Sequence, residues 1–260
     1  MLKPTLQDNH PNNTVFMICT QPRERYLRHL FRESTLQVRQ QYHIQYFFTL
    51  TQDDTIHLGL ERLQKEQDEY HDLLVFNHTN SYSNLALTVL LSYHYLQSLH
   101  LSSRYIVKMD SDVAVNIPSL ITLLYNSHNM DLRYAYIGDC ISTSYNTVLV
   151  DRKNYVPMEI VQEENWIDSY ARGGLYVIST NTLTPLLVAA RHFKFITHHE
   201  DAVIGRAMYK MNIVCQSFHK DYWLARYGCT EIEECKKYIA IHPYQDSKET
   251  KRYYSMFSLE

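Results

Sequence analysis

Two carboxylates, Asp110 and Asp112, come just after the short apolar run 105–107, with Ser111 between them. Burying an unpaired carboxylate is costly, so two at the end of a core strand need water, a basic group or a metal to compensate them. Hard cations such as Mg²⁺ and Mn²⁺ take oxygen ligands and bridge to substrate phosphates, and Lys108 could serve a phosphate or the fold. A lone D-x-D triplet is common by chance, and by itself it indicates a solvated loop more readily than a metal site.

A second polar cluster, His198, His199, Glu200 and Asp201, opens the stretch THHEDAVIGRAM. Either acid could be a general base that takes a proton from an attacking hydroxyl. A carboxylate at a helix start is also explained as a cap or by the helix dipole. The adjacent histidines would face opposite ways in a strand, which favours structural roles for them over metal binding.

Two further features depend on what the fold brings together. His242 follows a short apolar strand, and it would form a plausible Mn²⁺ pair if it lay beside Asp112. Gly173 and Gly174 precede the apolar run LYVIS, where a glycine pair permits close backbone approach to a ligand or a simple turn.

A basic segment also follows the first predicted strand. Arginine suits a diphosphate because its donors form a fork, but a solvated helix face is the simpler expectation for at least two of the four residues. The four arginines within ten residues are Arg23, Arg25, Arg28 and Arg32.

Apolar runs and helical periodicities alternate along the first half of the chain. Strands are predicted at 14–19, 44–51, 72–77 and 105–109, with further strands at 113–115, 134–139 and 175–179, and helices at 23–34, 58–70, 82–96, 181–192 and 201–211. Asn116 can cap another helix, with Pro118 in its first turn. This alternation predicts an α/β fold with a mainly parallel central sheet flanked by helices. Ligands bind beyond the carboxyl ends of such strands, which is where Asp110 and Asp112 lie.

Composition bounds the class of protein. The 260 residues are 45% hydrophobic and carry a formal net charge of −3, which permits a sizeable core and does not indicate nucleic-acid binding. We expect a polar lead-in over residues 1–13 and one domain over residues 14–260. No segment is apolar enough to span a bilayer and no signal peptide is visible, so we expect the chain to be cytosolic, a fragment, or trimmed of its anchor. Five cysteines permit a disulfide in the last fifty residues, and Asn12 and Asn77 begin glycosylation sequons.

The order of these motifs is more specific than any one of them. From about Val15 to about Pro243 it resembles the β-1,3-galactosyltransferase and β-1,3-N-acetylglucosaminyltransferase family (family 31 glycosyltransferases), whose members have the GT-A nucleotide-sugar fold. RERYLRHLF resembles R-x-x-x-I-R-x-T-W, EQDEYHDLLVF resembles E-x-x-x-Y-x-D-I-L, and KMDSDVAVN resembles K-x-D-D-D-V-x-V-N. YARGGLYVIS, EDAVIG and IAIHP are similar to the family's Y-x-x-G-x-G-Y-V-x-S, E-D-V-x-x-G and closing His segments.

The resemblance implies an inverting hexosyltransferase that moves galactose or N-acetylglucosamine from its UDP form to a glycan hydroxyl in β-1,3 linkage, on a glycoprotein or glycolipid. It also implies a Mn²⁺ (or Mg²⁺) ion and residence in the Golgi lumen as a type II membrane protein. The implied residue roles are these: Asp112 with His242 as metal ligands and Asp110 at the same nucleotide-metal site; Asp201 as catalytic base with Glu200 beside it; and Arg23, Arg28, Lys108, Ser111, Gly173 and Gly174 around the nucleotide or the residues that support it.

The chain departs from the family pattern at several positions. Ser111 replaces the middle acid, and Leu175 replaces the second Gly of G-x-G. The segment NSYSNLALTV is similar to the family's D-S-Y-x-N-L-T-L-K-T, but Asn80 stands in place of its Asp and Thr88 in place of its Lys. A shifted donor preference would follow if the middle acid mainly contacts the sugar or ribose. The departures also permit a catalytically weak or inactive relative that binds glycans or proteins. A third hypothesis, a metal-dependent hydrolase built on residues 198–201, ranks last because it ignores the motif order.

Overall fold

A computed structural model describes residues 2–6, 14–52, 57–79, 84–126, 132–142, 169–194, 196, 199–217, 222–242 and 247–257. Its main feature is a six-stranded sheet of order β3-β2-β1-β4-β7-β6. Five of the six strands run in one direction, because only β7 is antiparallel to both of its neighbours. The strands are β1 (Thr14–Cys19), β2 (Gln45–Gln52), β3 (Leu73–Thr79), β4 (Tyr105–Asp110), β6 (Tyr136–Ser142) and β7 (Ser169–Ser179). The predicted α/β class with a mainly parallel sheet is confirmed.

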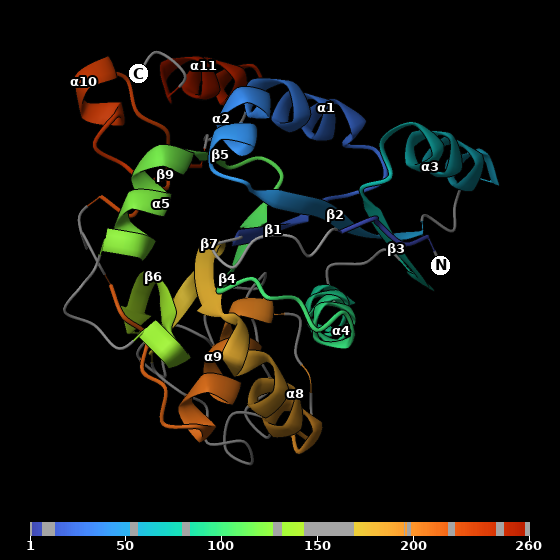
Figure 1. Ribbon diagram of the computed structural model, residues 1–260, viewed down its shortest axis with the longest axis vertical. Coiled ribbons are helices and arrows are strands. Elements are labelled where there is room, and N and C mark those ends of the chain that lie inside the picture. The colour runs from blue at the N-terminus through green and yellow to red at the C-terminus, as the bar shows by residue number, and fades with distance from the viewer. Residues whose placement is uncertain are drawn as a thin grey trace, which may run out of the picture.

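Helices cover both faces of this sheet (Figure 1). One face packs against α1 (Arg25–Ser34), α3 (His57–Tyr70), α5 (Ile117–Asn126) and α11 (Ser247–Phe257). The opposite face packs against α4 (Leu85–Ser98), α8 (Leu183–Arg191) and α9 (Glu200–Lys210). The central strands are therefore buried on both sides, which explains why β1 reads as a continuous apolar run rather than an alternating one.

Short elements complete the described chain: α2 (Leu36–Gln41), α10 (Ile232–Cys235), and the 3₁₀ turns η2 (Leu132–Tyr134) and η4 (Thr180–Thr182). The predicted cap of α5 is present, since the Ser119 N–H donates to Asn116 Oδ1 at 3.2 Å. Part of the N-terminal lead-in lies along β3, where Leu2 pairs with Val75. None of the helices in the described ranges is both long and apolar enough to cross a bilayer.

A small second sheet, of order β5-β9-β8, begins just after the acidic triplet and fixes the C-terminal end of that triplet. It consists of β5 (Ala114–Val115), β8 (Leu224–Ala225) and β9 (Ala240–Ile241). Ala114 in β5 pairs with Ile241 in β9, so the residue after β9, His242, lies next to the residues before β5. This pairing, between segments more than a hundred residues apart, brings His242 to Asp112.

The glycine pair lies differently from expectation. Gly173 and Gly174 stand inside β7, which begins at Ser169, six residues before the strand that the sequence predicts. The turn interpretation is therefore wrong. Glycine suits these positions because other side chains approach the strand closely: a Cβ on Gly174 would meet Leu224 Cδ2 at 3.2 Å.

Two disulfides join the described cysteines. Cys229–Cys235 fulfils the expectation of a bridge in the last fifty residues, and Cys140–Cys215 ties β6 to the segment after α9. Cys19 is the remaining, buried thiol.

Candidate active site

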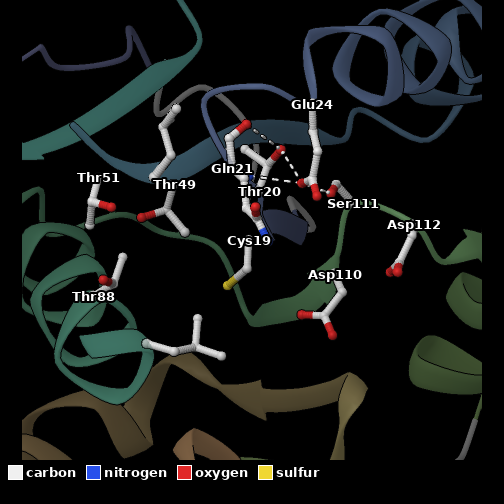
Figure 2. Close-up of a pocket in the computed structure, with 12 residues that line it drawn as sticks. Cys19, Thr20, Gln21, Glu24, Thr49, Thr51, Thr88, Asp110, Ser111 and Asp112 are labelled. Carbon is white, nitrogen blue, oxygen red and sulfur yellow. Dashed lines mark hydrogen bonds between the residues drawn. The ribbon is translucent and has the colours of Figure 1, made fainter. Parts of the chain in front are cut away.

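A candidate binding site is a cavity of about 300 Å³ at the carboxyl ends of β1, β2 and β4. Its lining comes from those strand ends, the turn before α1 and the first turn of α4 (Figure 2). The lining residues are Cys19, Thr20, Gln21, Glu24, Thr49, Leu50, Thr51, Leu85, Thr88, Asp110, Ser111 and Asp112. The acidic triplet that the sequence analysis singled out therefore forms one wall of this cavity.

Asp112 pairs with His242 at the edge of the cavity. His242 Nε2 lies 3.3 Å from Asp112 Oδ2, and the other carboxylate oxygen, Oδ1, is buried with no hydrogen-bond partner in the described part of the chain. Burial raises the pKa of Asp112, but the hydrogen bond and charge of His242 outweigh it, so that pKa is lowered overall. The same hydrogen bond raises the pKa of His242.

A carboxylate with one unsatisfied oxygen beside an imidazole is a donor set that suits Mn²⁺. The described residues contain no group of three or more His, Cys, Asp or Glu side chains arranged to hold a metal. The pair therefore suits an ion that takes its remaining ligands from water and substrate phosphates, as divalent ions at phosphate sites commonly do.

Lys108 is the centre of the polar network beneath the triplet. Its side chain is 1% exposed, and Nζ lies 2.8 Å from Asp110 Oδ1, 2.8 Å from Glu200 Oε1 and 2.6 Å from the Gly173 carbonyl oxygen. Burial opposes the ammonium charge, but the carboxylates raise the pKa of Lys108 well above its ordinary value. Lys108 thus joins a carboxylate of the cavity to a carboxylate at the start of α9.

Glu200 and Asp201 differ sharply in environment. Glu200 is 3% exposed, and burial raises its pKa to about 7 although Lys108 acts in the opposite direction. Asp201 is half-buried, and its Oδ2 accepts a hydrogen bond from the Gly173 N–H at 3.1 Å while Oδ1 accepts one from the Ala202 N–H. Asp201 is therefore the more accessible acid of the two.

Gly173 is the contact point between these groups. Its carbonyl oxygen accepts from Lys108, its N–H donates to Asp201, and a Cβ there would lie 3.4 Å from Glu200 Oε2 and 3.5 Å from Asp201 Oδ2. A larger side chain would crowd both carboxylates. Gly174 packs instead against Leu224 and Val113, away from the acids.

The predicted arginines divide into exposed and buried pairs. Arg23 and Arg25 are exposed. This confirms the expectation that at least two of the four arginines face solvent. Arg28, fully buried, forms a forked pair with Glu66 at 2.8 and 2.7 Å, and its Nη1 donates to the Gln21 carbonyl oxygen at 2.7 Å. Arg28 therefore supports the cavity wall through Gln21 and does not line the cavity.

Arg32 serves packing in the same cluster. It donates to Asp72 and to Glu66, each at 2.8 Å, and its guanidinium lies 3.9 Å from the centre of the Tyr70 ring. The E-x-x-x-Y-x-D motif is thus a counter-ion and stacking platform for the arginines of α1. Such buried, paired charges hold α1 against β3 and α3.

The structure thus brings most of the sequence-predicted site residues to one edge of the sheet. Asp110, Ser111 and Asp112 line the cavity, His242 joins it through Asp112, and Lys108 with Gly173 links it to the acids of α9. Arg23, Arg28 and Gly174 lie outside the described lining. His198 and Asn80 fall outside the described residues.

Several cavity residues were not predicted from the sequence, chiefly Glu24, Thr49 and Thr51. Thr49 and Thr51 lie near the end of β2, and Glu24 lies in the turn before α1. The rule that ligands bind beyond the carboxyl ends of parallel strands could have found the two threonines. Glu24 carried no such signal, because its position depends on the turn that leads into α1.

Comparisons with known proteins indicate the family and the fold of this chain. A family model described as Galactosyltransferase matches residues 25–219. Beta-1,3-galactosyltransferase 1 of Mus musculus is 24% identical over 183 residues, which cover 70% of this chain and 54% of that protein. Lactosylceramide 1,3-N-acetyl-beta-D-glucosaminyltransferase of Rattus norvegicus is 25% identical over 156 residues, covering 60% of this chain and 41% of the relative. The matched part of this chain spans about half the length of these curated relatives.

Among solved structures, the apo structure of the bifunctional glycosyltransferase WbbM superposes with a TM-score of 0.56 at 11% identity, covering 96% of this chain and 51% of that one. At this identity the likeness shows the fold, which is the GT-A type of glycosyltransferase. Because the family model covers three quarters of the sequence, the chain belongs to the galactosyltransferase family of glycosyltransferases.

Proposed function

We propose that this protein is an inverting hexosyltransferase, which moves galactose or N-acetylglucosamine from a UDP-sugar to a glycan hydroxyl in β-1,3 linkage on a glycoprotein or glycolipid. The observation that carries the proposal is the Lys108 network. One buried ammonium contacts both Asp110, on the cavity wall, and Glu200, the neighbour of Asp201. A nucleotide site and a candidate base are thereby held next to each other, as direct transfer requires.

The diphosphate group of the nucleotide would lie at the Asp110 to Asp112 end of the cavity. Asp112 and His242 would hold a Mn²⁺ or Mg²⁺ ion, which supplies positive charge to the diphosphate as it leaves. The unsatisfied Asp112 Oδ1 supports this role, since buried polar atoms normally have partners. The contact with Lys108 holds the Asp110 carboxylate in the cavity wall.

Asp201 would be the catalytic base. The acceptor oxygen attacks the anomeric carbon, the bond from that carbon to the diphosphate oxygen breaks, and the hydroxyl proton passes to Asp201. Because the hydroxyl and the diphosphate act from opposite sides, the anomeric configuration inverts without a covalent enzyme intermediate. Glu200 is too deeply buried to meet the acceptor, and it positions Lys108 instead.

The first test is a donor and acceptor screen with Mn²⁺, using radiolabelled UDP-galactose and UDP-N-acetylglucosamine. We expect Asp201→Asn to lower transfer by about a hundredfold or more while binding of UDP and Mn²⁺ persists. Asp112→Ala should abolish the metal-dependent part of UDP binding. Asp68→Asn, an exposed residue of α3, is the matched control and should leave both unchanged.

Transfer that survives both Asp112→Ala and Asp201→Asn would overturn these residue roles. If calorimetry detects no binding of UDP with Mn²⁺ even at millimolar concentration, the protein is instead a relative that binds glycans or proteins without catalysis. Ser111, in place of the family's middle acid, is the observation that keeps this alternative under test.

We also propose the Golgi lumen as the location of this domain. Two disulfides and an exposed Asn77 sequon support an oxidising, glycosylating compartment. Cell expression followed by treatment with peptide-N-glycosidase tests this: a mobility shift that Asn77→Gln reduces is expected. A fully reduced, unglycosylated product in the cytosol would contradict it.

A further inference from the structure

A carboxylate from another part of the chain contacts the serine of the acidic triplet. The Ser111 hydroxyl donates a hydrogen bond to Glu24 Oε2 at 2.9 Å, although the two residues are 87 positions apart. Glu24 lies in the turn that joins β1 to α1, and it lines the same cavity as Asp110 and Asp112 (Figure 2). The site therefore contains a third acid, which comes from a different element from the other two.

Glu24 is held in place by hydrogen bonds rather than by a cation. Its Oε2 also accepts from the Gln21 N–H at 2.8 Å and from the Thr20 hydroxyl at 3.2 Å. Among the described residues, Glu24 has no ion-pair partner, and its second oxygen, Oε1, accepts no hydrogen bond. A fixed carboxylate with one unused oxygen at a cavity wall is suited to accept hydrogen bonds from ligand hydroxyls.

A second feature of the cavity independently indicates a ligand. Thr51 is 5% exposed, lines the cavity, and its hydroxyl has no hydrogen-bond partner among the residues that the structure describes. Figure 2 shows this hydroxyl oxygen turned toward the other lining residues. Because buried hydroxyls are normally satisfied, an occupant that hydrogen-bonds to Thr51 is expected.

The order of groups along the cavity suggests which part of the ligand meets Glu24. Thr51 and Thr88 lie on one side of the view, Asp112 lies on the other, and Glu24 and Ser111 lie between them (Figure 2). A nucleoside diphosphate whose phosphates lie beside Asp112 would place its base toward the threonines and its ribose in the middle. The ribose carries two adjacent hydroxyl donors.

We propose that Glu24 accepts hydrogen bonds from the 2′- and 3′-hydroxyls of the donor ribose, and that it supplies the acid which position 111 lacks. This inference rests on the proposed function, since it assumes a nucleotide in the cavity. Ser111 is part of the device: its short side chain leaves room for Glu24 and donates to it. An aspartate at 111 would instead bring two carboxylates into contact, which is unfavourable.

Calorimetry in the presence of Mn²⁺ tests the proposal, with UDP and 2′,3′-dideoxy-UDP as the two probes. The wild-type protein should bind UDP more tightly by about tenfold or more, the range for hydrogen bonds to a charged group. Glu24→Ala should remove this preference by weakening UDP binding while leaving the dideoxy compound within about twofold, since that ligand makes no such hydrogen bond. Glu33→Ala, an exposed acid on α1, is the matched control and should change neither affinity.

A compensating variant separates a specific role from a general disturbance. Ser111→Asp should weaken UDP binding, and adding Glu24→Ala to it should restore both binding and the preference for UDP. Thermal unfolding of every variant checks that the fold persists. Equal weakening of both probes by Glu24→Ala, or no rescue in the double variant, would overturn the proposal.

Two further outcomes distinguish this inference from the proposed function. If Glu24→Ala spares UDP but weakens UDP-galactose, Glu24 contacts the transferred sugar and the ribose assignment is wrong. If UDP binding depends on Asp112 but shows no dependence on the ribose hydroxyls, this inference fails while the proposed function stands. If the wild-type protein binds no UDP, both fail.

Discussion

Lys108 is the buried cation that both halves of the candidate site share, so Lys108→Met is an informative single change. Methionine retains the apolar stem but removes the charge, and it leaves Glu200, which is 3% exposed, without its counter-ion. Asp110 is more exposed to water than Glu200, so the loss of the ammonium destabilises its carboxylate less. Removing one partner of a buried ion pair costs about 3–5 kcal/mol, and we expect that loss in the free energy of unfolding at alkaline pH.

The loss should shrink as the pH falls, because Glu200 can take up a proton. Burial raises the pKa of Glu200 to about 7 even with Lys108 beside it, and removing the ammonium raises it further. A carboxyl whose pKa is higher in the folded state than its unfolded value of about 4.3 binds more protons when folded, so stability falls as the pH rises through the folded pKa. The gap in stability between wild type and variant should therefore widen above about pH 7.

Urea unfolding followed by circular dichroism, at a series of pH values from about 5.5 to about 8.5, measures this dependence. Lys237→Met, at an exposed position, is the matched control and should show no pH-dependent loss. A loss that is equal at every pH would refute the reasoning, and so would a loss below about 1 kcal/mol at alkaline pH, because either result would mean that Glu200 does not depend on Lys108.

Two other predictions concern stability. Glu66→Gln leaves two buried arginines short of a counter-ion and should cost about 3 kcal/mol at neutral pH in urea unfolding. Burial alone would raise the pKa of Glu66, but the arginines lower it overall, so its contribution is present above about pH 4.3 and is lost as the pH falls through the lowered folded pKa. The variant should therefore approach the wild type in strong acid, and a gap that stays constant there would contradict this account. Replacing both cysteines of Cys140–Cys215 by serine should lower stability by about 4 kcal/mol, against about 2 kcal/mol for Cys229–Cys235, because the sequence separations are 75 and 6 residues. Equal losses in thermal unfolding would argue against the chain-entropy explanation.

Much of the fold could be predicted from local patterns. β1 is a nearly continuous apolar run, and β4 is apolar except at Lys108 and Asp110, because helices cover both faces of the sheet; the ends of both strands fall within one residue of the predicted ends. The sequence predicts too short a β7, because the first half of the strand carries two glycines and mostly half-buried residues, which weaken a strand signal. The local sequence likewise predicts that Asp110 and Asp112 stand at the end of a strand.

What the arginine segment does could not be predicted in the same way. Arg28 and Arg32 are indistinguishable from Arg23 and Arg25 by residue type, yet the first two are buried and the last two are exposed. The difference arises because α1 turns one face toward the sheet, and Glu66 of α3 binds the arginines on that face. Helical periodicity identifies a face, but the partner on another helix is set by packing.

The chemical groups of this protein, and the strand ends at which they stand, can be read from the order of its amino acids, because apolar runs and turn residues act locally. Which of those groups meet depends on how the distant segments pack. The second sheet brings His242 to Asp112, Lys108 reaches Glu200, and Glu24 reaches Ser111. Each of these contacts spans a long loop of chain whose closure is stabilised by the packed core, so no local pattern in the sequence encodes it.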